Sequence, residues 1–245
     1  MTTAEHTPWA AKAASLYDDA YAERYRSHDD DLADSVAYRL FVSWLDGICA
    51  RLTPPFDALD LGCGTGRYFW ALRGAGSLVG LDASDAMLAK ARHPLHEDRL
   101  TVGAVTLVQG DLLARDFEAG QFDLVYSIGV LAEHSPFDEM IAARVTRWLK
   151  PGGRFAFTTV HPRSFSVPRT VKRRAGEWLL SLGHVVPGGI RRALRARSMR
   201  DGLYADEDRV RDVLSAVDLA VESIEPFESD VHLHVLAVAR KKAAS

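Results

Sequence analysis

A short apolar run that passes directly into three closely spaced glycines constrains this chain most. Residues 58–61 (Ala-Leu-Asp-Leu) have the composition of a buried parallel strand, interrupted only by the carboxylate of Asp60. Gly62, Gly64 and Gly66 follow, and glycine allows a positive φ and a close approach of backbone N–H groups to a ligand. We expect a helix to begin straight after them, so that strand, turn and helix N-terminus form a cradle.

The spacing of the glycines separates this turn from other glycine-rich loops. A dinucleotide-binding loop, G-x-G-x-x-G, would need glycine at the position of Arg67. A phosphate-binding loop of the nucleotidases would need a Lys-Ser or Lys-Thr pair, which the turn lacks. A tight strand-to-helix turn with no ligand stays open as an alternative at this point.

Length and composition allow one α/β domain with a small insertion. The chain has 245 residues, of which 47% are hydrophobic and 26% charged, and its net charge of -3 gives no general attraction to nucleic acid. Its two cysteines, Cys49 and Cys63, lack metal-site spacing and suit a reducing compartment. The sequence shows no signal-peptide pattern and no apolar run near the ~20 residues of a membrane span, so we expect a cytoplasmic protein without a transmembrane segment.

Two further apolar runs end close to carboxylates. Residues 78–82 (Leu-Val-Gly-Leu-Asp) predict a second strand, and an acid about 20 residues beyond a glycine turn can accept hydrogen bonds from both hydroxyls of a ribose. Ser84 is then placed to cap a helix that contains Met87. Residues 105–109 predict the third strand, and Asp111 follows it as a ligand or as a helix N-cap.

Taken in order, these motifs resemble those of the class I S-adenosylmethionine (SAM) dependent methyltransferases. Asp60 to Gly66 matches the family's acidic-x-G-x-G-x-G motif, and Gly80 to Leu88 is similar to its second-strand segment. Residues 122–125 (Phe-Asp-Leu-Val), 131–134 (Leu-Ala-Glu-His) and 150–153 (Lys-Pro-Gly-Gly) also look like family sequences. The resemblance covers about residues 57–160 and is specific for the cofactor.

The resemblance implies SAM as cofactor, S-adenosylhomocysteine as product, and a set of binding residues. Asp82 would hold the ribose, Met87 would lie against the adenine, and Asp111 would receive its amino group. The segment from Tyr17 to Tyr25 looks like one that folds over the cofactor, although its tyrosines could simply pack the helix on the domain. The implied cofactor-binding residues are Tyr17, Tyr25, Asp60, Gly62, Cys63, Gly64, Gly66, Asp82, Ala83, Met87, Asp111, Leu112, Ser127 and Ile128.

The same family implies an α/β fold. Its sheet has seven mostly parallel strands with an antiparallel last strand, in the order 3-2-1-4-5-7-6, and helices on both faces. Extra N-terminal helices and an inserted cap would complete it. We expect helices over residues 8–26, 29–52, 67–72, 135–148 and 205–217, and one that begins at Ser84 and contains Met87 and Leu88. We expect strands over 122–127, 154–160, 221–227 and 231–239, the last of edge type. The expected division is 1–53 N-terminal helices, 54–162 SAM-binding core, 163–204 basic cap, and 205–245 C-terminal helix and two strands.

The expected cap is strongly basic. Residues 163–200 contain ten Lys and Arg residues and one acid, Glu177. A solvated charged surface explains this, and so does recognition of an anionic acceptor, an acidic carrier protein, RNA or an anionic membrane.

Methyl transfer mainly requires that two reactants are positioned, and a base where the acceptor must lose a proton. His134 is the first candidate base and His161 the second, although both could be ordinary loop histidines. No residue set has metal-site spacing, so we expect no metal. The segment after the fourth strand lacks the Asn/Asp-Pro-Pro-aromatic and Pro-Cys signatures of nucleobase-methylating enzymes.

The expected function is therefore methyl transfer from SAM to an O or N atom of a small, possibly anionic molecule. An RNA-modifying methyltransferase that uses the basic cap and a non-catalytic protein with the SAM fold are the alternatives. The sequence leaves the oligomeric state open.

Overall fold

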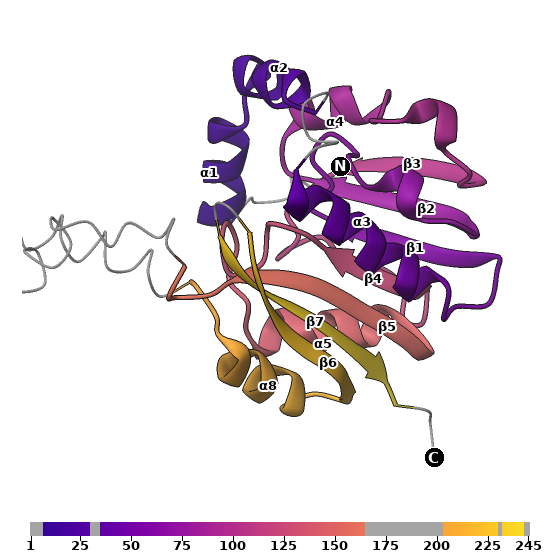
Figure 1. Ribbon diagram of the computed structural model, residues 1–245, viewed down its shortest axis with the longest axis vertical. Coiled ribbons are helices and arrows are strands. Elements are labelled where there is room, and N and C mark those ends of the chain that lie inside the picture. The colour runs from indigo at the N-terminus through magenta and orange to yellow at the C-terminus, as the bar shows by residue number, and fades with distance from the viewer. Residues whose placement is uncertain (1–6, 30–34, 165–202, 230–231, 243–245) are drawn as a thin grey trace, which may run out of the picture.

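Seven strands pair into one sheet, with helices on both of its faces (Figure 1). The structure is a computed structural model and describes residues 7–29, 35–164, 203–229 and 232–242. The strand order is β3-β2-β1-β4-β5-β7-β6, which confirms the expected order and fold class. The strands are β1 Phe56–Leu61, β2 Ala75–Asp82, β3 Ala104–Gln109, β4 Phe122–Ser127, β5 Leu149–Val160, β6 Leu219–Glu228 and β7 Leu233–Lys241.

The first five strands are parallel to one another, and of the last two only β7 runs in the opposite direction. β1 pairs in parallel with β2 and β4, whereas β7 pairs antiparallel with both β5 and β6. The expectation that residues 231–239 form an edge strand is wrong. β6 occupies the edge, and β7 returns between β5 and β6, where six of its nine residues are buried.

The N-terminal helical region is divided at Tyr17. Tyr17 leaves the helical conformation (φ -96°, ψ 57°), and the Asp18 side chain accepts the N–H of Tyr21 at 2.8 Å, which starts a second helix. The single helix expected over 8–26 is therefore wrong. The helices are α1 Pro8–Leu16, α2 Asp19–Ser27, α3 Val36–Cys49, α4 Asp85–Ala91, α5 Glu139–Trp148 and α8 Glu207–Ser215, with 3-10 helices η2 Phe69–Ala71 and η3 Glu97–Arg99. None of the helices within the described ranges is both long enough and apolar enough to cross a membrane.

Caps also move the starts of two other expected helices. α3 begins after Ser35, whose side chain accepts the Tyr38 N–H, and not at the acids 29–31. α5 begins after Asp138 and not at Ser135, because the Asp138 carboxylate accepts the first free N–H groups of that helix. The family-like run over residues 150–153 lies within β5.

The α-helix expected directly after the glycines is absent from the structure. Residues 67–68 form turns, and only the short 3-10 helix η2 follows before β2 begins at Ala75. The Phe69 and Leu72 N–H groups bond to carbonyls three residues earlier. The link to β2 is thus closed by 3-10 bonds, and no α-helix begins between the glycine turn and β2.

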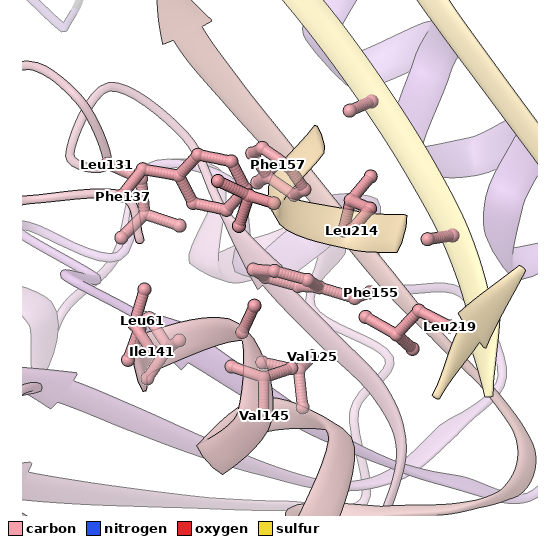
Figure 2. Packing of buried hydrophobic residues seen from close by; sticks show 14 of the residues in the cluster. Leu61, Val125, Leu131, Phe137, Ile141, Val145, Phe155, Phe157, Leu214 and Leu219 are labelled. Atoms are coloured by element: carbon pink, nitrogen blue, oxygen red, sulfur yellow. The ribbon is translucent and has the colours of Figure 1, made fainter. Parts of the chain in front are cut away.

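Apolar side chains fill both sides of the sheet. On one side, α5 and α8 cover β4, β5 and β7, and Figure 2 shows Phe137, Phe155 and Phe157 together with Leu214 in this cluster. On the other side, residues of α3 such as Leu45 pack against β1 and β2. Because both faces are covered, the exposed parts of the central strands are their ends.

Most of the expected basic cap, residues 165–202, lies outside the described residues. Its role, and the boundaries expected at 163 and 204, stay predictions.

Candidate cofactor and active site

A cavity of about 380 Å³ opens at the carboxyl ends of the central parallel strands. Four adjacent strands contribute to its wall: Gly62 follows β1, Asp82 ends β2, Gly110 follows β3, and Ile128 follows β4. The crevice outside the carboxyl ends of the strands is where open α/β sheets bind ligands. Eleven of the sixteen site residues expected from sequence line it: Tyr17, Tyr25, Gly62, Gly64, Asp82, Ala83, Met87, Asp111, Leu112, Ile128 and His134.

The glycine turn (residues 62–66) has the backbone conformation that glycine alone adopts readily. Gly62, Gly64 and Gly66 have φ of 79°, 54° and 74°. Several of its N–H groups are used within the protein, however. Those of Gly62 and Cys63 donate to the Leu81 carbonyl at 2.7 and 3.0 Å, which ties the turn to β2. The expectation of N–H groups free for a ligand is therefore wrong for these two positions.

Asp82 links the end of β2 to the glycine turn. Its Oδ2 accepts the Gly64 N–H at 2.8 Å, and its Oδ1 accepts the Ser84 N–H at 2.9 Å. Burial raises the pKa of the Asp82 carboxyl, and these backbone bonds act against the rise. Each carboxylate oxygen has two acceptor sites, so the backbone bonds leave part of the acceptor capacity of Asp82 unused.

Five expected site residues do not line the cavity. Cys63, Gly66 and Ser127 belong to the turn and strand end that shape it. Asp60 is 3% exposed and lies in β1, behind the turn. Burial raises the pKa of Asp60 to about 8, so this carboxyl is largely protonated at neutral pH.

We expect Asp60→Asn to stabilise the protein more at pH 8 than at pH 5. The folded state raises the pKa of Asp60 above its unfolded value, so the folded state binds the extra proton between about pH 4 and 8, and stability falls as pH rises through this range. Because Asn cannot ionise, the variant should not show this loss of folding stability as the pH rises. Urea unfolding of both proteins at the two pH values measures it, and an equal effect at both would contradict the protonated state.

His161 is placed away from the cavity. It is 5% exposed, its Nε2 lies 3.3 Å from Glu207 Oε2, and its Nδ1 accepts the Arg163 N–H at 2.9 Å. Both ring nitrogens are thus engaged beside α8. The antiparallel β7 and α8 cover the end of β5, which the linear sequence does not reveal, and His161 is no longer a candidate base.

His134 does line the cavity, and it has a partner from the N-terminal helices. Its Nε2 lies 3.0 Å from the Tyr17 hydroxyl and 3.6 Å from Glu133 Oε1. Burial raises the pKa of Glu133 to about 7, and burial likewise raises the pKa of the Tyr17 hydroxyl. The N-terminal helical region and the segment after β4 thus bring Tyr17, Glu133 and His134 together at the cavity.

An N-terminal arm (residues 7–29) covers the cavity with aromatic rings. Three hydrogen bonds hold the arm at the carboxyl ends of the strands. The Thr7 N–H donates to Asp111 Oδ2 at 2.8 Å, and Ser84 Oγ donates to the Tyr17 carbonyl. Thr65 Oγ1 donates to Asp29 Oδ2 at 3.2 Å. The arm therefore follows the cavity from the end of β3 to the glycine turn.

Sequence reasoning missed several residues that line the cavity. Glu133 stands in the Leu-Ala-Glu-His run, where its position beside His134 was a usable signal. The sequence indicates only that Arg67 starts a helix, and nothing in it indicates that His232 would reach the site. Arg67, Val130 and Glu133 are among the lining residues that the sequence does not predict. Within the described ranges, no three His, Cys, Asp or Glu side chains come together as a metal site.

Comparison with known proteins agrees with this geometry. Residues 58–153 match the model of a family described as a methyltransferase domain. The chain is 38% identical over 105 residues to a ubiquinone biosynthesis O-methyltransferase of Methylococcus capsulatus (42% of this chain, 43% of the relative). It is 37% identical over 109 residues to a demethylmenaquinone methyltransferase of Lactococcus lactis (42% of each). The chain spans less than half the length of these two curated relatives.

Among solved structures, the magnesium protoporphyrin IX methyltransferase of Synechocystis with bound S-adenosylhomocysteine has a similar fold. The TM-score is 0.63 at 16% identity, and the match covers 96% of this chain and all of that one. The sheet order and the overall fold are those of a Rossmann-like methyltransferase. Residues 58–153, which hold nearly all of the first four strands and the cavity-lining turns, thus match a methyltransferase domain in sequence.

Proposed function

We propose that this protein transfers the methyl group of SAM to an O or N atom of a small molecule. The observation that carries the proposal is the cavity itself, around which the glycine turn, Asp82 and Asp111 follow three adjacent parallel strands. The names of the relatives support a small-molecule acceptor, since they concern ubiquinone, menaquinone and porphyrin methylation.

The cavity residues fit SAM in one orientation. The acceptor capacity left on the Asp82 carboxylate suits hydrogen bonds from the ribose. Met87 and Leu112 supply apolar walls for the adenine, with Asp111 near its amino group. The methionine part then lies at the glycine turn, under Tyr25 of the N-terminal arm.

SAM supplies an electrophilic methyl group, whose transfer breaks the S–C bond as the acceptor atom forms its own bond to carbon. The protein therefore has to position the acceptor in line and, for a hydroxyl or ammonium acceptor, to take up its proton. His134 is the residue placed to do so, with the proton going to its ring. Tyr17 donates to or accepts from His134 Nε2, and so orients the ring.

Two measurements test this function. Calorimetric titration with SAM and with S-adenosylhomocysteine should show binding. Incubation with methyl-labelled SAM and pools of small hydroxyl and amine compounds should move the label to a product. No binding of either nucleoside would end the proposal, and binding without transfer to any acceptor pool would favour a non-catalytic protein.

We expect Asp82→Ala to weaken SAM binding by about 1.5–3 kcal/mol, which is typical of hydrogen bonds to a charged group. The substitution also frees the Gly64 N–H, so a thermal melt without ligand should accompany the titration. Asp85→Ala is a matched control, because Asp85 lies on α4 three residues away and does not line the cavity. An unchanged affinity in Asp82→Ala would show that Asp82 does not hold the ribose.

A further inference from the structure

A second cavity, of about 410 Å³, lies beside α3 and shares no lining residue with the first. Three segments form it: one face of α3, η2 with the link that follows it, and η3 with the residue before it. Positions 38, 42 and 46 of α3 all line it, because residues four apart lie on one face of a helix. Its volume lies within the range of about 300–1,000 Å³ that small-molecule sites occupy. The proposed methyl transfer does not use this cavity.

Guanidinium groups from all three segments line the second cavity. They belong to Arg39 of α3, Arg73 after η2 and Arg99 of η3, and Asp46 is the one acid among the described lining residues. The two acidic residues of η3 precede Arg99 and do not line the cavity. Arg73 Nε lies 3.6 Å from Asp46 Oδ1, whereas Arg99 has no carboxylate partner among the residues that the structure describes. The lining therefore carries a net positive charge of two, which attracts an anion with two charges.

An aromatic wall stands next to these charges. Trp70 Nε1 donates to the Tyr38 hydroxyl at 2.8 Å, and the Trp70 ring centre lies 5.0 Å from that of His96. Arg99 Cζ lies 5.9 Å from the centre of the Trp70 ring. Tyr38 is 5% exposed, and its hydroxyl accepts from Trp70 while it has one proton of its own to donate.

His96 has an uncommon backbone conformation for a residue other than glycine. Its φ is 55° and its ψ is 43°, in the left-handed region. Such conformations persist only where the surrounding structure fixes them, and they cluster at ligand sites. The conformation places the His96 imidazole at the cavity, edge-on to Trp70.

We propose that the second cavity binds a phosphate monoester carried on a planar ring system, such as a nucleoside monophosphate. Guanidinium groups bind phosphate through paired hydrogen bonds. A phosphate monoester carries a charge of about −1.5 to −2 at pH 7, which matches the charge of the lining, whereas a single carboxylate carries half of it. Trp70 and His96 supply aromatic contacts for the ring system. The assignment does not rest on the proposed function.

The test uses uridine 5′-monophosphate, which has a ring and a phosphate monoester but no adenine. Calorimetric titrations at one fixed, low salt concentration compare it with uridine, which lacks the phosphate, and with inorganic phosphate, which lacks the ring. Uridine monophosphate should bind at least about tenfold more tightly than either, because each of the others loses one set of contacts. Saturating S-adenosylhomocysteine should leave its affinity unchanged within about twofold, since the two cavities share no residue.

Two variants separate the charge from the aromatic wall. Arg99→Gln should lower the affinity for uridine monophosphate by about tenfold, the size of a lost charge-assisted hydrogen bond, and leave that for uridine unchanged. Trp70→Leu should weaken the binding of uridine monophosphate and leave that of inorganic phosphate unchanged, which also shows that the variant is folded. Trp70→Phe keeps a ring and should lie between Trp70→Leu and the wild type. Arg92→Gln is the matched control, because Arg92 is exposed and does not line the cavity.

Three outcomes would overturn the assignment. Equal affinities for uridine monophosphate and inorganic phosphate would show that the arginines form only a charged surface. Competition by S-adenosylhomocysteine would place uridine monophosphate in the first cavity. A single-stranded RNA that bound more tightly than uridine monophosphate, and that lost affinity in Arg99→Gln, would make the cavity part of a nucleic-acid interface. A wild type that binds S-adenosylhomocysteine but not uridine monophosphate would refute this assignment and leave the proposed function intact.

Discussion

Replacing His134 by alanine is expected to lower kcat by about 10²- to 10⁴-fold, the usual contribution of a general base. His134 lines the cavity. The other expected base, His161, does not, because its ring contacts Glu207 of α8. Affinity for S-adenosylhomocysteine should stay close to that of the wild type, because the proposed cofactor contacts lie elsewhere in the cavity. Steady-state kinetics with a hydroxyl acceptor, combined with calorimetry, measure both quantities.

The pH profile separates a base from a merely structural histidine. The low-pH fall of kcat in the wild type should disappear in His134→Ala if protonation of His134 causes it. Glu133 must be tested alongside, because burial raises its pKa to about 7 and it would titrate in the same range. Glu133→Gln should retain the low-pH fall. His93→Ala is the control, since the His93 side chain is exposed and does not line the cavity. A kcat for His134→Ala within about threefold of the wild type would remove His134 from the mechanism.

Gly62→Ala is expected to destabilise the protein by about 2–5 kcal/mol. Two costs add. An alanine at φ 79° pays about 1–2 kcal/mol for the left-handed conformation. Its Cβ would also lie 2.4 Å from Val130 Cγ2, and overpacking of this kind costs about 1–3 kcal/mol. Because Gly62 and Val130 both line the cavity, SAM affinity should fall as well. Urea unfolding and titration with SAM measure the two effects.

Two variants separate these costs. Gly120→Ala pays the conformational cost alone, since its φ is 68° and nothing lies within 4 Å of an added Cβ. The double variant Gly62→Ala/Val130→Ala removes the clash, so it should lose less stability than the two single variants added together. Strict additivity of Gly62→Ala and Val130→Ala would mean that the methyl group and Val130 do not meet.

The sequence predicts an element well when the residues at its ends define where it starts and stops, as a capping side chain or a turn does. Ser84 caps α4 as its sequence predicts, and β4 has the expected bounds, because an apolar run between turns suffices to define a buried strand. The sequence predicts a residue's role poorly where that role depends on a contact with a residue far along the chain. Asp29 looks like part of an acidic helix start, yet its carboxylate is used by Arg67, thirty-eight residues further along the chain.

The sequence by itself determined the sheet order, through its resemblance to a known family, and the chemistry at the strand ends, because glycines and acids follow apolar runs at short, readable distances. Only the tertiary structure decided which side chains share the cavity. In the folded protein Tyr17 bonds to His134, 117 positions away, Arg67 lines the cavity, and His161 contacts Glu207 outside it. Such contacts depend on how separate elements pack in space, and residue spacing along the chain carries no record of that packing.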